Sequence, residues 1–235
     1  MELIFEIKRK KDAESESYIQ KVRFETWDEK ETIASALKKI NESGDYVDEN
    51  GSEVGQITWE AGCLQKKCGA CAMLVNGQPR LACDVFLREM KKKKTITLAP
   101  LSKFPVIRDL VTDRSVMFDN LRQIHLWMGE DAGISEKNLN DAFDGARCLQ
   151  CGCCLEACPN FFPNGKFVSA AAYAPQARLI ASYDQEEMKE IKSLYSKHIY
   201  EGCAKALACQ KVCPAQIDLD RILSRSNAIS IWHRH

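Results

Sequence analysis

The sequence lacks long apolar runs and an excess of charge of either sign, and each absence excludes a class of protein. No segment of its 235 residues approaches the roughly 18 consecutive apolar residues that a membrane-spanning helix needs. Residues 1–10 lack the apolar core of a secretory signal. The 33 basic and 33 acidic residues balance, so no overall field attracts nucleic acid. We therefore expect a cytosolic chain with no nucleic-acid partner and no membrane span of its own.

Cysteine is abundant, with 12 residues. Disulfide scaffolds of this cysteine content are typical of short secreted chains. Because neither condition holds here, we expect the cysteines to be reduced and to serve as metal ligands.

The densest group of cysteines extends from Cys148 to Pro159. If Cys153 is left out, it reads C-x2-C-x2-C-x3-C-P, which is the bacterial ferredoxin spacing. In that arrangement the first three thiolates hold one iron–sulfur cluster and the fourth ligates a second cluster. A lone C-x2-C is more typical of zinc, but three ligands at this spacing with a C-P end strongly indicate clusters.

The same pattern recurs downstream with one replacement. Counted from Cys203, offsets 3, 6 and 10 fall on Ala206, Cys209 and Cys213, followed by proline. If the fourth cysteines are exchanged between the sites, one set is complete and the other has a methyl group in place of a thiolate. The complete set predicts a [4Fe-4S] cluster held by Cys148, Cys151, Cys154 and Cys213. The incomplete set predicts a [3Fe-4S] cluster held by Cys158, Cys203 and Cys209, because an iron without its thiolate is easily lost.

Cys153 remains unassigned by this scheme. We expect a small buried residue whose side chain points away from the cluster. The alternative is a ligand that completes a second [4Fe-4S] cluster.

A different cysteine motif lies in the first half of the chain. Cys63-x4-Cys68-x2-Cys71, with Cys83 eleven residues further on, has the plant-type spacing of a [2Fe-2S] cluster. Small residues beside these ligands, such as Gly62 and Gly69, allow backbone N–H groups to approach the sulfur atoms. A four-cysteine zinc knuckle is the alternative, although structural zinc sites usually use two short hooks. No histidine lies near these cysteines, which excludes a Rieske centre.

Hydrophobic periodicity predicts a small mixed domain in the first half. Alternation around Leu3–Ile7 and Val22–Phe24 predicts an antiparallel hairpin, and residues 28–40 read as a helix. A second hairpin is expected around the turn Asn76-Gly77, with a final strand at residues 95–98. Pro100 and Pro105 bracket a short connection, which divides the chain into residues 1–103 and 104–235.

The second half reads as helical. One long or broken amphipathic segment is expected from Leu110 to Met128, and shorter helices at residues 141–146, 165–183 (broken near Pro175), 186–200 and 217–231. The aromatic and methionine side chains of these helices are expected to form core and not to contact cofactors.

A plant-type [2Fe-2S] motif followed by a two-cluster motif resembles the iron–sulfur subunits of succinate dehydrogenase and fumarate reductase. The resemblance covers nearly the whole chain and rests on residues 63–73, 81–83, 105–110, 148–159 and 203–214. It implies an α+β fold, with an N-terminal β-grasp [2Fe-2S] ferredoxin domain followed by an α-helical two-cluster ferredoxin domain. In that family the third cluster is [3Fe-4S], which agrees with alanine at position 206.

The resemblance also implies an electron-transfer role without a substrate site. Single electrons would pass between the covalently bound FAD of a separate flavoprotein subunit and a quinone held near a membrane-anchor subunit. This chain has no flavin fingerprint G-x-G-x-x-G, in agreement with FAD residing on another chain. The protein would then lie on the cytoplasmic side of the inner membrane, held there by its partners.

By the same resemblance, Pro159, Asn160 and Ala204 would face the quinone. Ubiquinone-linked members typically carry a tryptophan shortly after the first C-P and a histidine just after the first cysteine of the second run. Here Phe161-Phe162-Pro163 and Ala204 stand at those places, which favours menaquinone or an acceptor site built mainly by the partner.

Two other functions fit parts of the pattern. The same three clusters could serve a soluble fumarate or other enoate reductase with a non-quinone donor. A zinc-stabilised interaction module without a redox role is the alternative from another class.

Overall fold

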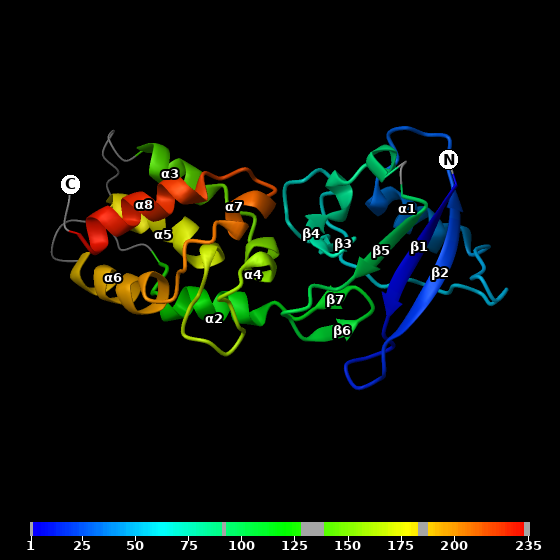
Figure 1. The fold of residues 1–235 in the computed structure, drawn as a ribbon, viewed down its shortest axis with the longest axis horizontal. Coiled ribbons are helices and arrows are strands. Elements are labelled where there is room, and N and C mark those ends of the chain that lie inside the picture. The colour runs from blue at the N-terminus through cyan, green and yellow to red at the C-terminus, as the bar shows by residue number, and fades with distance from the viewer. Residues whose placement is uncertain (1, 91–92, 128–138, 183–187, 233–235) are drawn as a thin grey trace. The chain divides into compact units, whose positions relative to one another are not determined.

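The computed structural model describes residues 2–90, 93–127, 139–182 and 188–232 (Figure 1). The chain forms two compact units, Met1–Asp113 and Arg114–His235, each with its own core. Their boundary lies at Asp113, later than the connection at residues 100–105 that the sequence predicts. The physical reason is found in the contacts of Asp109, described below.

The first unit contains a mixed five-stranded sheet in the order β2-β1-β5-β3-β4. β1 pairs in parallel with β5, whereas all other pairs are antiparallel. Asn76 and Gly77 have φ of 49° and 75°, as the tight turn between β3 and β4 requires. Both predicted hairpins are present. The strands are β1 (Glu2–Arg9), β2 (Tyr18–Glu25), β3 (Ala72–Val75), β4 (Gln78–Leu81) and β5 (Thr95–Ala99).

Helix α1 (Ile33–Ser43) buries Ile33, Leu37 and Ile40 in the core of this unit. It begins five residues after the predicted start at Asp28, because a capping box fixes its first turn. The Thr32 Oγ1 accepts from the Ser35 N–H at 3.1 Å, and the Ser35 Oγ accepts from the Thr32 N–H at 2.8 Å. Together, α1 and the mixed sheet have the β-grasp architecture that the resemblance implies.

A short hairpin of β6 (Val106–Arg108) and β7 (Val111–Thr112) completes the unit. Asp109, in the turn of this hairpin, accepts hydrogen bonds from Arg9 Nε and from the backbone N–H groups of Lys10 and Thr58. These contacts tie residues 106–112 to β1 and explain the later boundary. The sequence prediction of a helical pattern from Leu110 is wrong for this segment.

The second unit is helical, with α5 in the middle and α2, α3, α4, α6 and α8 in contact with it (Figure 1). Small side chains at Ala170, Ala172 and Ala174 allow this close approach. Pro175 lies inside α5, and the helix is continuous where the sequence predicts a break. The helices are α2 (Ser115–Gln123), α3 (Leu139–Ala146), α4 (Cys153–Ala157), α5 (Ala170–Ser182), α6 (Met188–Tyr195), α7 (Ala208–Val212) and α8 (Leu219–Ser230), with a π-helical turn at Ser196–Tyr200.

Of the long segment predicted between Leu110 and Met128, only α2 is helical, and Met128 lies outside the described residues. A left-handed residue, His125 with φ of 51°, follows α2.

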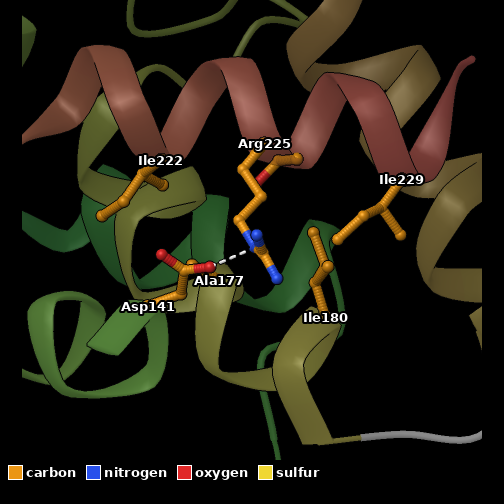
Figure 2. Close-up of a pocket in the computed structure, with 7 residues that line it drawn as sticks. Asp141, Ala177, Ile180, Ile222, Arg225 and Ile229 are labelled. Atoms are coloured by element: carbon orange, nitrogen blue, oxygen red, sulfur yellow. Dashed lines mark ion pairs between the residues drawn. The ribbon is translucent and has the colours of Figure 1, made fainter. Parts of the chain in front are cut away.

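Ion pairs fasten α3 to α8. The buried carboxylate of Asp141 pairs with Arg221 and Arg225, and Arg221 Nη2 also lies 2.6 Å from Asp144 Oδ2. Figure 2 shows the Arg225 guanidinium extending from α8 toward Asp141, beside Ile222 and Ile229. The pair lines a small pocket whose other walls are mostly apolar. Because the surroundings are apolar, the charge of the Asp141 carboxylate is stabilised mainly by its arginine partners.

Candidate metal centres

Four cysteines of the first unit meet around the loop that precedes β3. Cys63 Sγ accepts backbone hydrogen bonds from Gln65 at 3.3 Å and from Lys67 at 3.2 Å. The Lys66 N–H lies 3.3 Å from Sγ of Cys83, which belongs to the short 3-10 turn after β4. The loop therefore brings Cys83 to the other three cysteines, as the plant-type spacing predicts.

The hydrogen bonds and burial of this loop shift thiol pKa values in opposite directions. The backbone N–H groups of Gln65 and Lys67 lower the pKa of Cys63 to about 7, whereas burial raises the pKa of Cys71 to about 12. A Cβ at position 62 would lie 2.9 Å from Cys68 Sγ, so a larger residue there would displace the Cys68 thiol. Backbone N–H donors like those of Gln65 and Lys67 are the usual partners of cluster sulfur atoms.

In the second unit, four cysteines line one pocket. These are Cys148, Cys151, Cys154 and Cys213, the same four that the exchanged repeat selects for a [4Fe-4S] cluster. Ala170, Ala171 and Ala174 of α5 form an apolar wall of this pocket. Burial raises the pKa of Cys148 to about 11, so a free thiolate is disfavoured and a bound cation would stabilise it.

The repeat read from the sequence is also present in the backbone. Gln150 and Lys205, at offset 2, have φ of 49° and 55°. Gly152 and Leu207, at offset 4, have φ of 85° and 53°. Each loop then enters a five-residue helix, α4 or α7, that ends at the cysteine before proline. Two loops of the same conformation thus present their cysteines in the same way.

The remaining set, Cys158, Cys203 and Cys209, is also brought together. Burial raises the pKa of Cys209, and the neighbouring thiols of Cys158 and Cys203 raise it further. Ala206 is exposed at the place that Cys151 occupies in the other loop. Three cysteines therefore gather at the second site, and the repeat has Ala206 at the position of the fourth.

Cys153 is fully buried, and its side chain contacts the Cys151 thiol. The pocket lined by the four cysteines does not include it among the described residues. A hydrogen bond from Cys153 lowers the pKa of Cys151 to about 7. Its burial is as expected, whereas its contact with the Cys151 thiol differs from the expectation that the side chain points away from the cluster.

The residues expected to face a quinone lie beside the incomplete set. Pro159 and Ala204 are exposed, and Asn160 Nδ2 donates to the Gly202 carbonyl at 2.8 Å. This bond joins the segment after Cys158 to the segment before Cys203. Phe161 is fully buried, whereas Phe162 is 63% exposed.

Two side chains near the cysteines are missed by sequence reasoning. The Gln150 Nε2 lies 3.3 Å from Cys148 Sγ, and the Tyr173 hydroxyl lies 3.5 Å from Cys209 Sγ. The expectation that the helix aromatics serve only as core is therefore incomplete for Tyr173. A polar residue between two ligand positions is the only sequence signal for Gln150, and none identifies Tyr173.

The cysteine sets suit clusters better than single ions. None of the twelve cysteines is paired in a disulfide. Among the described residues, no three His, Cys, Asp or Glu side chains converge as ligands of one metal ion. The cysteine spacings are those of iron–sulfur ligand sets, whereas a structural zinc site usually uses two short hooks.

Within the described ranges, none of the helices combines the length and apolar composition needed to cross a bilayer.

Known families and relatives match this arrangement. A family described as a 2Fe-2S iron–sulfur cluster binding domain matches residues 4–119, and one described as a 4Fe-4S dicluster domain matches residues 144–217. A chain of the Mycobacterium smegmatis Sdh1 complex in the apo form shares the fold, with a TM-score of 0.71 and 20% identity over 97% of this chain and 96% of that one. The expected α+β fold, with a [2Fe-2S] ferredoxin domain and a two-cluster domain, is confirmed.

Two curated relatives identify the family. The chain is 32% identical over 206 residues to the succinate dehydrogenase iron–sulfur subunit of Bacillus subtilis, covering 83% of this chain and 79% of that protein. It is 31% identical over 170 residues to the fumarate reductase iron–sulfur subunit of Wolinella succinogenes, covering 67% and 70%. With this identity over most of both chains, and with matches to a 2Fe-2S domain and a 4Fe-4S dicluster domain in the ranges that contain the gathered cysteines, the chain belongs to the family of succinate dehydrogenase and fumarate reductase iron–sulfur subunits.

Proposed function

We propose that this chain carries single electrons between the FAD of a flavoprotein subunit and a quinone, with menaquinone as the expected quinone, at a membrane-anchor subunit. The observation that carries the proposal is that eleven cysteines gather in three places, and we assign them to sets of four, four and three. When bound, iron–sulfur clusters accept and release electrons one at a time. The chain contributes the ligands, the apolar surroundings and the hydrogen bonds around them.

The ligand sets are part of this proposal. Cys63, Cys68, Cys71 and Cys83 hold the [2Fe-2S] cluster, and the loop N–H groups stabilise their negative charge. The pocket-lining set Cys148, Cys151, Cys154 and Cys213 holds the [4Fe-4S] cluster. The set Cys158, Cys203 and Cys209 holds the [3Fe-4S] cluster, because the methyl group of Ala206 cannot ligate a fourth iron.

The acceptor side of the chain lies next to the [3Fe-4S] set. Pro159 and Ala204 are exposed there, together with the large apolar side chain of Phe162. An exposed apolar group of this kind is suited to contact with an anchor subunit and a quinone ring. The proposal also makes the chain a peripheral subunit, which its partners hold on the cytoplasmic side of the inner membrane.

Metal content and EPR of the chain purified without oxygen, together with its partner subunits, test this function. Roughly nine irons per chain are expected, the sum of two, four and three in the ligand sets. The EPR spectrum of the oxidised protein should contain a [3Fe-4S] signal that disappears on reduction. Zinc in place of iron would contradict the proposal.

Two matched variants test the exchange of ligands between the runs. Cys213→Ser should remove the [4Fe-4S] signal and keep the [3Fe-4S] signal, whereas Cys158→Ser should do the reverse. The opposite result would place each fourth cysteine with its own run. Reduction of fumarate by a menaquinol analogue, in the complex with its partners, separates the quinone-linked function from a soluble reductase with a non-quinone donor.

A further inference from the structure

The side-chain amide of Gln150 lies between a cysteine of the [4Fe-4S] set and the backbone of α5. Its Nε2 lies 3.3 Å from Cys148 Sγ and 2.8 Å from the carbonyl oxygen of Ala171. One NH₂ group has two hydrogens, so both contacts can be made at the same time. The amide nitrogen is therefore aimed at the sulfur atom by a second, shorter hydrogen bond.

The Ala171 carbonyl is available because of Pro175. In an α-helix the carbonyl of residue 171 accepts from the N–H of residue 175, and proline has no N–H. Pro175 lies inside α5 without breaking it. The helix thus presents a carbonyl without its usual helical donor at the wall of the cysteine pocket, and Gln150 supplies the donor.

The orientation of the amide follows from the same contacts. Turning the amide over would place Oε1 against the carbonyl oxygen and the sulfur atom, both of which are acceptors. In the observed orientation Oε1 is buried and has no hydrogen-bond partner among the described residues. A buried acceptor without a partner is costly, so the two donor contacts of Nε2 decide the orientation.

The repeat offers an internal comparison. Lys205 has the same position and backbone conformation in the other loop, yet its amine lies over the Trp232 ring, 5.6 Å from the ring centroid. Burial raises the pKa of the first cysteine in each loop, and backbone N–H groups of Gln150 and Lys205 oppose that rise in the same way. The side-chain donor to a first cysteine is present in one loop and absent from the other among the described contacts.

We propose that Gln150 is a positioning residue that raises the reduction potential of the [4Fe-4S] cluster by donating a hydrogen bond to the Cys148 thiolate. This inference rests on the ligand set given under the proposed function. Reduction adds negative charge to the cluster and its sulfur ligands, and a fixed donor stabilises the reduced form more than the oxidised form. Pro175 contributes indirectly, by leaving the Ala171 carbonyl to hold the amide in place.

The test is an EPR-monitored redox titration of the [4Fe-4S] cluster in the assembled protein. Gln150→Leu keeps the approximate size of the side chain and removes the donor. The equilibrium constant for reduction is expected to fall about tenfold, which is about 59 mV for one electron. Lys205→Leu is the matched control from the repeat, and its [4Fe-4S] potential should stay unchanged.

A second variant tests the part assigned to Pro175. Pro175→Ala restores an N–H that competes for the Ala171 carbonyl, so a smaller shift in the same direction is expected. An unchanged potential in Gln150→Leu, or an equal shift in Lys205→Leu, would overturn the proposal. Loss of the cluster in Gln150→Leu would show a structural role and would also overturn it. Absence of a [4Fe-4S] signal from the unaltered chain would instead contradict the proposed function.

Discussion

The hydroxyl of Tyr173 lies 3.5 Å from Sγ of Cys209, and the ring to which it belongs is almost completely buried. Burial, with a further contribution from the nearby cysteine thiols, raises the pKa of Tyr173 far above its ordinary value. The phenol therefore keeps its proton and acts as a donor to the sulfur atom. Helix α5 thus serves both cysteine sets, through the Ala171 carbonyl at one and the Tyr173 hydroxyl at the other.

Replacing Tyr173 by phenylalanine should lower the reduction potential of the [3Fe-4S] cluster. The aromatic packing is kept and one donor is lost, so we expect a decrease of about 30–60 mV, or roughly threefold to tenfold in the equilibrium constant. Redox titration followed through the EPR signal of the oxidised cluster measures the change. An unaltered potential would show that the hydroxyl does not donate to Cys209.

Ala206→Cys should convert the third cluster to [4Fe-4S], because a thiolate would then stand at the vacant corner. The EPR signal of the oxidised [3Fe-4S] cluster should disappear, and the iron content should rise by roughly one per chain. Ala208→Cys is the control, since Ala208 begins α7 as Cys153 begins α4. A signal that persists in Ala206→Cys would mean that the repeat misplaces the vacant corner.

Cys153→Ser should keep all three clusters, because Cys153 contacts the Cys151 thiol and does not line the cysteine pocket. Iron analysis and EPR of the purified variant check this. The adjacent change Cys154→Ser, on the same helix, should remove the [4Fe-4S] signal. Loss of any cluster in Cys153→Ser would overturn its assignment as a bystander.

The cluster loops are the part of this protein that the sequence predicts best. Ligand spacing is imposed by the geometry of the clusters, so the two motifs and the alanine at position 206 can be read without a structure. The left-handed residues at equal offsets in both loops agree with that reading.

Contacts between distant segments could not be predicted in this way. Periodicity extends the first helix back to Asp28, whereas hydrogen bonds between Thr32 and Ser35 decide its start. Periodicity also assigns Leu110 to a helix. In the structure the neighbouring Asp109 lies in the turn of a β-hairpin, where it accepts a hydrogen bond from Arg9, one hundred positions away. The roles of Gln150 and Tyr173 depend on how closely α5 approaches the loops, which no local pattern contains.

Gly145→Ala should destabilise the second unit, although alanine is favoured over glycine in a helix by about 1 kcal/mol. A Cβ at position 145 would lie 2.5 Å from the carbonyl oxygen of Ala174, so α3 and α5 would have to separate. We expect a net loss of about 1–3 kcal/mol in the free energy of unfolding, measured by urea denaturation. The exposed neighbour Asn140 provides the control, because Asn140→Ala should be neutral or slightly stabilising.

Asp109→Asn should destabilise the first unit by about 3–5 kcal/mol, because it leaves the buried Arg9 guanidinium without its charged partner. Burial raises the pKa of Asp109, but hydrogen bonds from Arg9, Thr58 and Lys10 outweigh it, and the pKa is lowered overall.

The pH dependence of this effect follows from the sign of that shift. A carboxyl with a lowered pKa in the folded state stabilises the fold above its unfolded pKa of about 4, and the contribution is lost as the pH falls through the folded value. The difference in unfolding free energy between the unaltered chain and Asp109→Asn should therefore stay constant from pH 8 to about pH 5 and narrow below about pH 4. Urea denaturation across this range measures the difference. A difference that grows on acidification would mean that the ion pair does not hold residues 106–112 to β1.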